Sequence, residues 1–526
     1  MTYKTKLSFK DISRSLKKQR ILLKLKTAKG FDESKSYTIA VDESSTSSES
    51  CFILYDGVNL KAKDKLSKKL LTTIKLIIIE KEELIDLLPT SISYLLVSSG
   101  RRAWSYLAAE AYSNPQEQLK IIGITGTNGK TTTAWILTDL LKQMGKKSAY
   151  IGTLGSSLLK TKEKKHTTPD PCELFALLKK AKDENYEYIA LEVSSHALSQ
   201  EKISPIGFSS AIFTSFSRDH LDFHKSMKEY FQTKLSLFEN YLRPSAPVFF
   251  HQSLASRLTE GFLEKTKPSF YCEFKAEYQQ QRTLSTLHLY NQKSKGLDTS
   301  FIHFNLGGKN YKTEIPFLGQ HNCDNFFVSV LVAQALTQQI KENTWPLLHQ
   351  VPGRLERILP GAKKEPYLFV DYAHTPDALE RALVFLKSKQ STGKLFVLFG
   401  CGGDRDQGKR PLMGAVAEKT ADKVIITTDN PRNEEPAQII ADIQKGFSNK
   451  KKFLVIENRK EAIYKALKMI NKQDCLLLAG KGHEPYQEIK GKKYLFSEQK
   501  ILSEYFRKKV RKNESNHLER LRNSVS

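Results

Sequence analysis

The sequence feature that most constrains the fold is the stretch 121–144. Residues 121–124 are mainly apolar, residues 126–132 read Gly-Thr-Asn-Gly-Lys-Thr-Thr, and apolar residues recur at helical spacing over 134–144. Glycines let backbone N–H groups turn inward around an anion, the lysine adds a charge for β- and γ-phosphates, and the threonine hydroxyl suits Mg²⁺. The pattern predicts a strand, a phosphate-binding loop for a nucleoside triphosphate, and a helix. An ordinary strand–turn–helix with a chance Gly-Lys-Thr is the alternative.

This phosphate-binding loop departs from the usual pattern in one respect. The usual pattern has a glycine five residues before Gly129, and this chain has Ile124 there. We therefore interpret the loop as a shortened variant.

Length and charge limit the class of protein to which this chain can belong. The chain has 526 residues, enough for about three domains at roughly 150 residues each. Its formal net charge is +26. The lysine-rich runs are dispersed and lack interleaved aromatic residues, which favours solvated surface faces over a nucleic-acid site. We expect small-molecule partners and no nucleic acid. The basic runs are 61–69, 160–165, 450–452 and 507–526.

Apolar runs and cysteines indicate the compartment. No apolar run approaches the roughly 20 residues of a membrane span, and residues 1–20 lack the apolar core of a secretory signal. The cysteines have no paired spacing, which disfavours both a disulfide framework and a zinc site; they are Cys51, Cys172, Cys272, Cys323, Cys401 and Cys475. We expect a cytoplasmic monomer without a membrane span.

The order of apolar runs predicts an α/β protein with an N-terminal unit, a central unit and a C-terminal unit. The N-terminal unit, 1–115, has expected strands at 37–41, 51–55, 76–79 and 94–97 and a helix at 100–111. The central unit, 116–350, starts at the phosphate-binding loop. Its further expected strands are 148–152, 188–193, 210–215 and 247–250, followed by a β-rich stretch (284–290, 300–305, 311–315) and a helix at 326–337.

The C-terminal unit, 351–505, alternates short apolar strands with helical stretches. This alternation predicts a doubly wound, mostly parallel sheet, and ligands of such sheets bind at the carboxyl ends of the strands. We expect residues 506–526 to form a loose basic tail. The expected strands are 367–371, 394–400, 423–428, 453–456 and 474–480.

Polar side chains follow two expected strands of the central unit. Glu192 lies where the strand 188–193 ends, and a carboxylate there suits Mg²⁺, which takes one or two carboxylates. The loop 217–224 holds Arg218, Asp219, His220, Asp222 and His224, a cluster that a ligand or metal would satisfy.

The motifs described so far resemble the Mur ligases, the ATP-dependent amide ligases of peptidoglycan precursor synthesis. The resemblance extends over roughly residues 90–505. It is carried first by 125–132, 192–196, 217–222, 319–322 and 352–356, and it is sharpened toward the MurE subfamily by 371–376, 399–406, 409–413, 429–432 and 480–484.

The resemblance implies a three-domain architecture, with a mostly parallel central domain of the P-loop type and a Rossmann-like C-terminal domain. It also implies that a substrate γ-carboxylate is phosphorylated by ATP and that an amine then displaces the phosphate. The implied ATP-binding residues are Gly126, Thr127, Asn128, Gly129, Lys130, Thr131, Thr132, Asn322, Arg354 and Asp371.

The resemblance also implies the charged groups of catalysis. The implied catalytic residues are Lys130, Glu192, His220 and Lys234, and the implied Mg²⁺ ligands are Thr131, Glu192, His220 and Lys234. Lys234 falls where the family carries a lysine carbamylated by CO₂, an anionic oxygen ligand for a hard metal. From the residues alone, a lysine on a solvated helix face is the alternative.

Two substrate sites follow from the resemblance. For a UDP-N-acetylmuramoyl dipeptide it implies Thr167, Thr168, Ser194, Gln200 and Lys202, with Lys202 standing where many members have arginine. The N-terminal unit departs from the family at 42–45 and 56–59, so we assign no uridine-binding residue there.

For meso-diaminopimelate the resemblance implies Arg410, Asp429, Asn430, Pro431, Arg432, Gly480 and Glu484. Diaminopimelate carries a second carboxylate that the Arg432 guanidinium suits, whereas lysine offers only an ammonium at that end. Taken alone, Asp429-Asn430-Pro431 also fits a plain β-turn. Use of L-lysine, a folylpolyglutamate-type ligase and a basic non-enzymatic binding protein are the rival functions.

Overall fold

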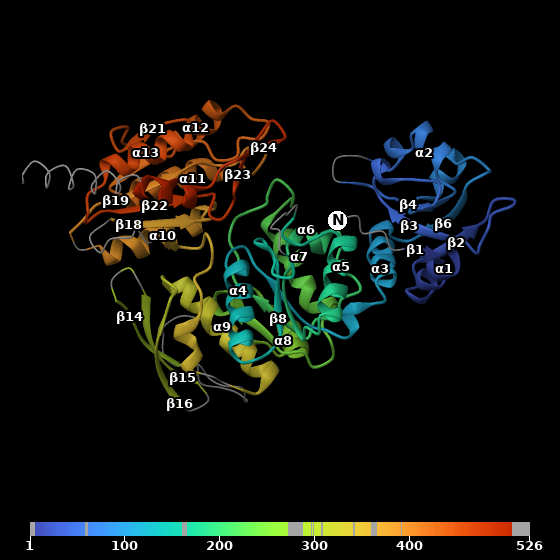
Figure 1. The fold of residues 1–526 in the computed structure, drawn as a ribbon, viewed down its shortest axis with the longest axis horizontal. Coiled ribbons are helices and arrows are strands. Elements are labelled where there is room, and N and C mark those ends of the chain that lie inside the picture. Colours follow the sequence, from blue (N-terminus) through green and yellow to red (C-terminus); the bar gives the residue numbers. More distant parts are fainter. Residues whose placement is uncertain are drawn as a thin grey trace, which may run out of the picture.

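The computed structural model describes residues 6–57, 61–159, 166–271, 288–295, 297, 299–306, 309–339, 342–358, 366–390 and 392–507. Within these residues the strands form a six-stranded, a seven-stranded and a second six-stranded sheet, together with a three-stranded sheet and a two-stranded hairpin. Figure 1 shows the blue N-terminal sheet at one end of the molecule, the central sheet in the middle and the orange to red C-terminal sheet at the other end.

The N-terminal sheet has the strand order β1-β3-β4-β5-β6-β2, with β3 to β6 parallel and β1 and β2 antiparallel at its edges. Helices α1 and α3 pack on one face and α2 on the other. The sequence predicted the inner strands and α3 but not the edge strands, of which β2 is largely exposed. The bounds are β1 Lys6–Ser8, α1 Phe9–Lys18, β2 Leu22–Lys26, β3 Ser36–Ala40, β4 Ser50–Leu54, α2 Lys68–Thr73, β5 Leu76–Ile79, β6 Ser93–Val97 and α3 Gly100–Ala111.

The central sheet has the order β13-β12-β11-β7-β10-β8-β9 and is parallel except for the short β8–β9 hairpin. Helices cover both faces, which is why its inner strands are almost continuously apolar. The strand, loop and helix predicted for 121–144 are confirmed as β7 and α4. The bounds are β7 Lys120–Thr125, α4 Lys130–Gln143, β8 Ser148–Gly152, β9 Gly155–Ser156, α5 Pro171–Asp183, β10 Tyr188–Glu192, α6 Ser195–Ser199, β11 Ser210–Phe213, α7 Met227–Asn240, β12 Val248–His251, α8 Glu260–Thr266 and β13 Ser269–Tyr271.

An antiparallel three-stranded sheet follows, in agreement with the predicted β-rich stretch. Its strands are β14 His288–Lys295, β15 Thr299–Leu306 and β16 Lys309–Ile315; residues 284–287 of the expected first strand lie outside the described residues. Helix α9, Gln320–Thr337, begins six residues earlier than predicted. Its first turn is polar, so apolar periodicity does not reveal it, and Gly319 before it has φ +86°.

The C-terminal sheet has the order β17-β18-β22-β19-β20-β21 and is parallel except for β17, which confirms the doubly wound prediction. Its bounds are β17 Glu356–Ile358, β18 Tyr367–Asp371, α10 Pro376–Lys389, β19 Leu395–Phe399, α11 Lys409–Thr420, β20 Lys423–Ile426, α12 Pro436–Gln444, β21 Phe453–Val455, α13 Arg459–Met469 and β22 Cys475–Ala479, followed by the hairpin strands β23 Tyr486–Ile489 and β24 Lys492–Leu495.

The end of the chain differs in part from the prediction of a loose tail from 506. Residues 498–507 are helical, and Phe506 packs against the core under β22 and α13 because its aromatic ring is apolar. The rest of the expected tail, like the basic run 160–165, lies outside the described residues. Among the residues that are described, no helix combines the length and the apolar character needed to cross a membrane.

Candidate functional site

The phosphate-binding loop lies between β7 and α4 and is closed by the loop after β11. Gly126 has φ +143° and Gly129 has φ +86°, values that favour glycine. A Cβ on Gly126 would also lie 2.1 Å from Thr214 Oγ1. The first backbone N–H groups of α4 have no partner within the helix, and the helix dipole is positive at this end. The loop is therefore built to surround an anion.

Two lysine ammonium groups converge on one carbonyl of this loop. Lys130 Nζ donates to Gly126 O (2.7 Å) and Thr127 O (2.9 Å), and Lys234 Nζ on α7 donates to Gly126 O (2.9 Å). Lys234 is only 1% exposed, so the alternative of a solvated lysine is wrong. Burial, and then the charge of Lys130, lowers the pKa of Lys234 well below its usual range, and burial also lowers the pKa of Lys130.

Glu192 ends β10 beside the loop and is fully buried. Its carboxylate accepts hydrogen bonds from Thr131 Oγ1 (3.0 Å), from Thr153 N (2.8 Å) and Oγ1 (3.0 Å), and from the hydroxyl of Tyr150. Arg354 Nη2 donates to the same Thr131 hydroxyl (3.0 Å). The sequence predicted Glu192 and Thr131 as partners of one ion, and the structure brings their oxygens together.

The loop after β11 faces the C-terminal sheet. Asp219 is buried, and its carboxylate lies 3.5 Å from His220 Nε2, 3.6 Å from His374 Nε2 and 3.6 Å from Lys409 Nζ. Burial lowers the pKa of His220 to about 3, so the ring is neutral at neutral pH, the form of imidazole that binds metals. Among the described residues, no three His, Cys, Asp or Glu side chains are grouped as a metal site; any ion here would need hydroxyl, lysine-derived or nucleotide oxygens as well.

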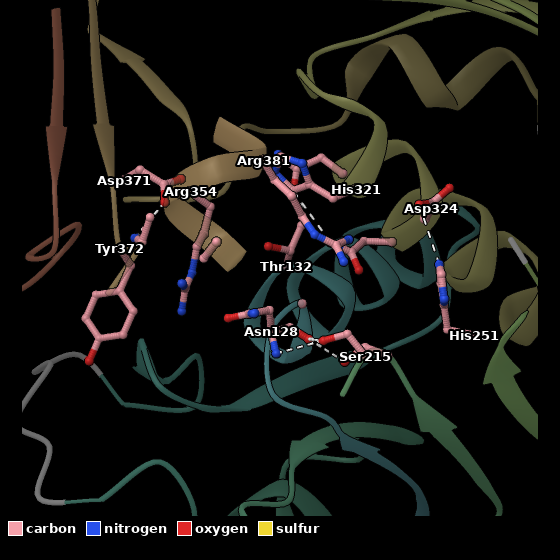
Figure 2. A pocket seen from close by; sticks show the side chains of 16 residues that line it. Asn128, Thr132, Ser215, His251, His321, Asp324, Arg354, Asp371, Tyr372 and Arg381 are labelled. Carbon is pink, nitrogen blue, oxygen red and sulfur yellow. Dashed lines mark hydrogen bonds and ion pairs between the residues drawn. The ribbon is translucent and has the colours of Figure 1, made fainter. Parts of the chain in front are cut away.

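A pocket lies between the phosphate-binding loop, α9 and the start of the C-terminal unit (Figure 2). Asn128, Gly129, Thr132, Asn322, Arg354 and Asp371, all predicted as nucleotide-binding, line it. Arg354 stacks over the ring of Tyr372 at 4.6 Å, and Asn128 Nδ2 donates to Asp377 Oδ2 (3.1 Å) at the start of α10. The Asn128–Asp377 bond, like the bond from Arg354 to Thr131, joins the central and C-terminal units, as expected for a nucleotide bound between them.

Several polar residues of this pocket were not assigned to it from the sequence, among them His251, Asp324, Asn325 and Arg381. Figure 2 shows His251 and Asp324 side by side, and their side chains approach to 3.8 Å. The position of His251 at the carboxyl end of β12 was a usable signal, because ligands bind at that edge of a parallel sheet.

The residues predicted to hold the UDP-linked dipeptide lie around the end of β10. Thr168 Oγ1 donates to Glu192 O (2.7 Å) and lies 3.3 Å from Ser194 Oγ, and Thr167 accepts from Thr153 Oγ1 (3.2 Å). Lys202 Nζ is paired with Asp170 (2.7 Å). Gln200 ends α6, and its backbone N–H donates to His196 O (2.9 Å).

The residues predicted to hold the amino acid come from loops after β20 and β22. Asn430 Nδ2 donates to Glu484 Oε2 (2.8 Å), and a Cβ on Gly480 would lie 2.6 Å from Asp429 Oδ2. Lys481, which the sequence analysis did not single out, is fully buried and donates to Asn430 Oδ1 (2.9 Å) and Glu484 Oε2 (3.3 Å). We call Asp429, Asn430, Gly480, Lys481 and Glu484 the C-terminal loop cluster.

The two arginines predicted for this site have different surroundings. Arg432 has φ +52° and a side chain 20% exposed, and its Nη1 donates to Gly403 O (2.6 Å) beside Pro431. Arg410 is fully buried, and its guanidinium is held by Glu434 (2.8 Å) and Asp442 (3.0 Å). These two carboxylates compensate the buried charge of Arg410, and its predicted contact with the amino-acid substrate stays a prediction.

Comparisons with known proteins agree with this geometry. Residues 124–333 match the Mur ligase middle domain, and residues 353–482 match the domain described as Mur ligase, glutamate ligase domain. The chain therefore belongs to the Mur ligase family, whose members are ligases, and it shares their three-domain architecture.

Individual relatives narrow the comparison to one branch of the family. The chain is 38% identical over 419 residues to the UDP-N-acetylmuramoyl-L-alanyl-D-glutamate–2,6-diaminopimelate ligase of Pseudomonas aeruginosa, and the match covers 78% of this chain and 83% of the relative. It is 37% identical over 436 residues to the enzyme of that name from Bacteroides fragilis, and that match covers 81% of this chain and 86% of the relative. A solved structure with that name matches with a TM-score of 0.61 and 26% identity over 96% of this chain and 99% of the other.

A more distant structure supports the fold alone. MurF from Thermotoga maritima, solved in complex with ADP, has a TM-score of 0.57 and 17% identity over 91% of this chain and 98% of its own.

Proposed function

We propose that this chain joins meso-diaminopimelate to UDP-N-acetylmuramoyl-L-alanyl-D-glutamate and cleaves ATP to ADP and phosphate. The γ-carboxylate of the dipeptide attacks the γ-phosphorus of ATP, and ADP leaves. The amine of diaminopimelate then attacks the acyl phosphate, and an amide bond forms as phosphate departs. All reactants are strongly charged, so the protein acts chiefly by positioning and by electrostatic stabilisation. Its relatives of 37–38% identity carry the name of this activity.

ATP is proposed to bind between the central and C-terminal units. The loop 126–132 would hold the phosphates through backbone N–H groups and Lys130, while the pocket of Asn322, Arg354 and Asp371 would receive the nucleoside. Burial raises the pKa of Asp371, and its carboxylate accepts a hydrogen bond from Ala373 N (2.7 Å). Because the pocket is lined from both units, their closure would assemble it.

The oxygens around Glu192 fit Mg²⁺, which prefers carboxylate, hydroxyl and phosphate oxygens. Glu192 and Thr131 would hold an ion at the phosphates, and His220 is proposed for a second one. Bound Mg²⁺ would neutralise the phosphate and carboxylate charges.

Lys234 fits carbamylation by CO₂ because only a neutral amine reacts with it, and the buried site lowers the pKa of Lys234 well below its usual range. The carbamate would place an anion in place of this neutral amine beside the Lys130 ammonium and would supply oxygen ligands.

One observation carries the choice of amino acid. Arg432 presents a guanidinium beside the C-terminal loop cluster, and Asn430 and Glu484 within that cluster are hydrogen-bonded to each other. A second carboxylate on the substrate would pair with Arg432, and lysine has none. Asp429 and Gly480 complete the proposed site, and Pro431 shapes the turn.

The UDP-linked dipeptide is proposed to bind at Thr167, Thr168, Ser194, Gln200 and Lys202, next to Glu192. We further propose that residues 1–115, 116–350 and 351–505 form three domains and that the protein acts in the cytoplasm as a monomer.

Phosphate release from the purified chain tests the proposal. The reaction contains ATP, Mg²⁺ and UDP-N-acetylmuramoyl-L-alanyl-D-glutamate, and one amino acid is added at a time. We expect release with meso-diaminopimelate and much less with L-lysine. Faster release with lysine would overturn the choice of amino acid, and release with neither would overturn the ligase assignment for this acceptor.

A further inference from the structure

The β23–β24 hairpin is hydrogen-bonded to the loop that carries Arg432. The N–H of Arg432 donates to Glu488 O (3.1 Å), and the N–H of Lys490 donates to Arg432 O (2.7 Å). Arg432 and Ile489 form a parallel bridge at this point. The left-handed backbone of Arg432, which strains a residue with a side chain, is thus held on both sides by the hairpin.

The same strand also contacts the residues before Arg432. The N–H of Glu488 donates to Asn430 Oδ1 (3.0 Å), and Gln487 Nε2 donates to Asp429 O (2.7 Å). The hairpin therefore fixes the backbone and one side chain of the loop Asp429–Arg432 together.

A side-chain contact completes the arrangement. Arg432 Nε lies 3.3 Å from Glu488 Oε2, with the two side chains 20% and 27% exposed. Nη1 of the same guanidinium donates to Gly403 O. Within the described part of the chain, no hydrogen bond joins Nη2 to another residue. The side chain is held at two of its nitrogens, and the third remains available to a ligand.

We propose that Glu488 is a positioning residue that orients Arg432 toward the second carboxylate of the amino-acid substrate, an inference that rests on the proposed function. A free arginine side chain samples many rotamers, and a ligand that binds it must order it. Glu488 orders the guanidinium before the substrate arrives and leaves Nη2 free. The hairpin thereby contributes to selectivity without touching the reacting atoms.

The opposite effect of Glu488 is physically conceivable and gives a different result. If its carboxylate mainly competed with the substrate carboxylate for Arg432, its removal would strengthen binding. The sign of the change in KM for meso-diaminopimelate separates the two effects.

The experiment compares Glu488→Ala, Glu488→Gln and Glu435→Ala with the unaltered full-length chain. Glu435 is the matched control because it pairs with Lys490 of the same hairpin at 3.7 Å, with both side chains about three-quarters exposed. For Glu488→Ala we expect KM for meso-diaminopimelate to rise about three- to tenfold, with kcat and KM for ATP unchanged. Glu488→Gln, which keeps an oxygen at the same position beside Nε, should stay within about twofold of the unaltered chain.

Each outcome bears on the proposal. An unchanged or lower KM in an active Glu488→Ala protein overturns the inference and leaves the proposed function intact. An equal rise in KM for Glu435→Ala, or a fall in kcat alone, indicates general disruption of the hairpin and also overturns it. If the unaltered chain releases no phosphate with meso-diaminopimelate, the proposed function fails and this inference falls with it.

Discussion

Removal of the buried ion pair between Arg459 and Glu498 should lower the stability of the C-terminal unit by a large amount. Both side chains are fully buried, and Arg459 Nη2 lies 2.9 Å from Glu498 Oε1. Arg459 Nη2 also donates to Ala479 O (2.7 Å), at the end of β22 and directly before Gly480. In Glu498→Ala the guanidinium would lose its only carboxylate partner among the described residues. Such a loss costs about 3–5 kcal/mol, or a fall in Tm of about 6–20 °C for a unit of about 150 residues.

Thermal unfolding of the full chain, followed in the transition of its C-terminal part, measures this effect. Glu380→Ala is the control, since its pair with Lys419 is exposed at 4.0 Å and should shift Tm by no more than about 2 °C. The double variant Arg459→Met/Glu498→Leu should be more stable than Glu498→Ala because it leaves no buried charge. A Glu498→Ala protein that melts within about 2 °C of the unaltered chain would refute the reasoning.

Two further predictions concern catalysis and pH. Lys234→Ala should lower kcat by about 10²–10³-fold and regain part of it with an added short-chain carboxylate, whereas Lys228→Ala on the same helix should not change it; full activity in Lys234→Ala excludes the carbamate. Burial would raise the pKa of Asp422, but hydrogen bonds from Lys387 and from Leu395 N hold it below its ordinary value. Its stabilisation is therefore present at neutral pH and lost as pH falls below about 4. Tm measured against pH should show Asp422→Asn less stable than the unaltered chain at pH 7 and converging with it in acid; a gap that persists in acid contradicts this.

The local sequence pattern was sufficient to predict much of the fold. The strand before Gly126 and the helix after Lys130 follow from apolar periodicity and from the two glycines of the loop. The parallel order of the C-terminal sheet follows from alternating strands and helices. The predicted start of α9 was wrong, because the first turn of the helix, Gln320-His321-Asn322, is polar and carries no apolar signal.

The surroundings of the site residues were harder to predict from the sequence, because their partners lie far away along the chain. Lys234 is one lysine among many in the sequence, and only the fold buries it against Gly126. The sequence gives no signal for the two carboxylate partners of Arg410, and the fold places Glu434 and Asp442 beside it. Glu488 carries no motif, since its significance comes from lying beside Arg432.

The sequence by itself determined that a phosphate-binding loop begins the central unit, that parallel sheets follow, and that carboxylates and imidazoles stand at their strand ends. These are consequences of neighbours along the chain. The tertiary structure alone decided which lysine is buried away from water and which carboxylates lie beside Arg410 and Arg432. Burial and ion pairing depend on residues far apart in sequence, and they set the charge and orientation of each group.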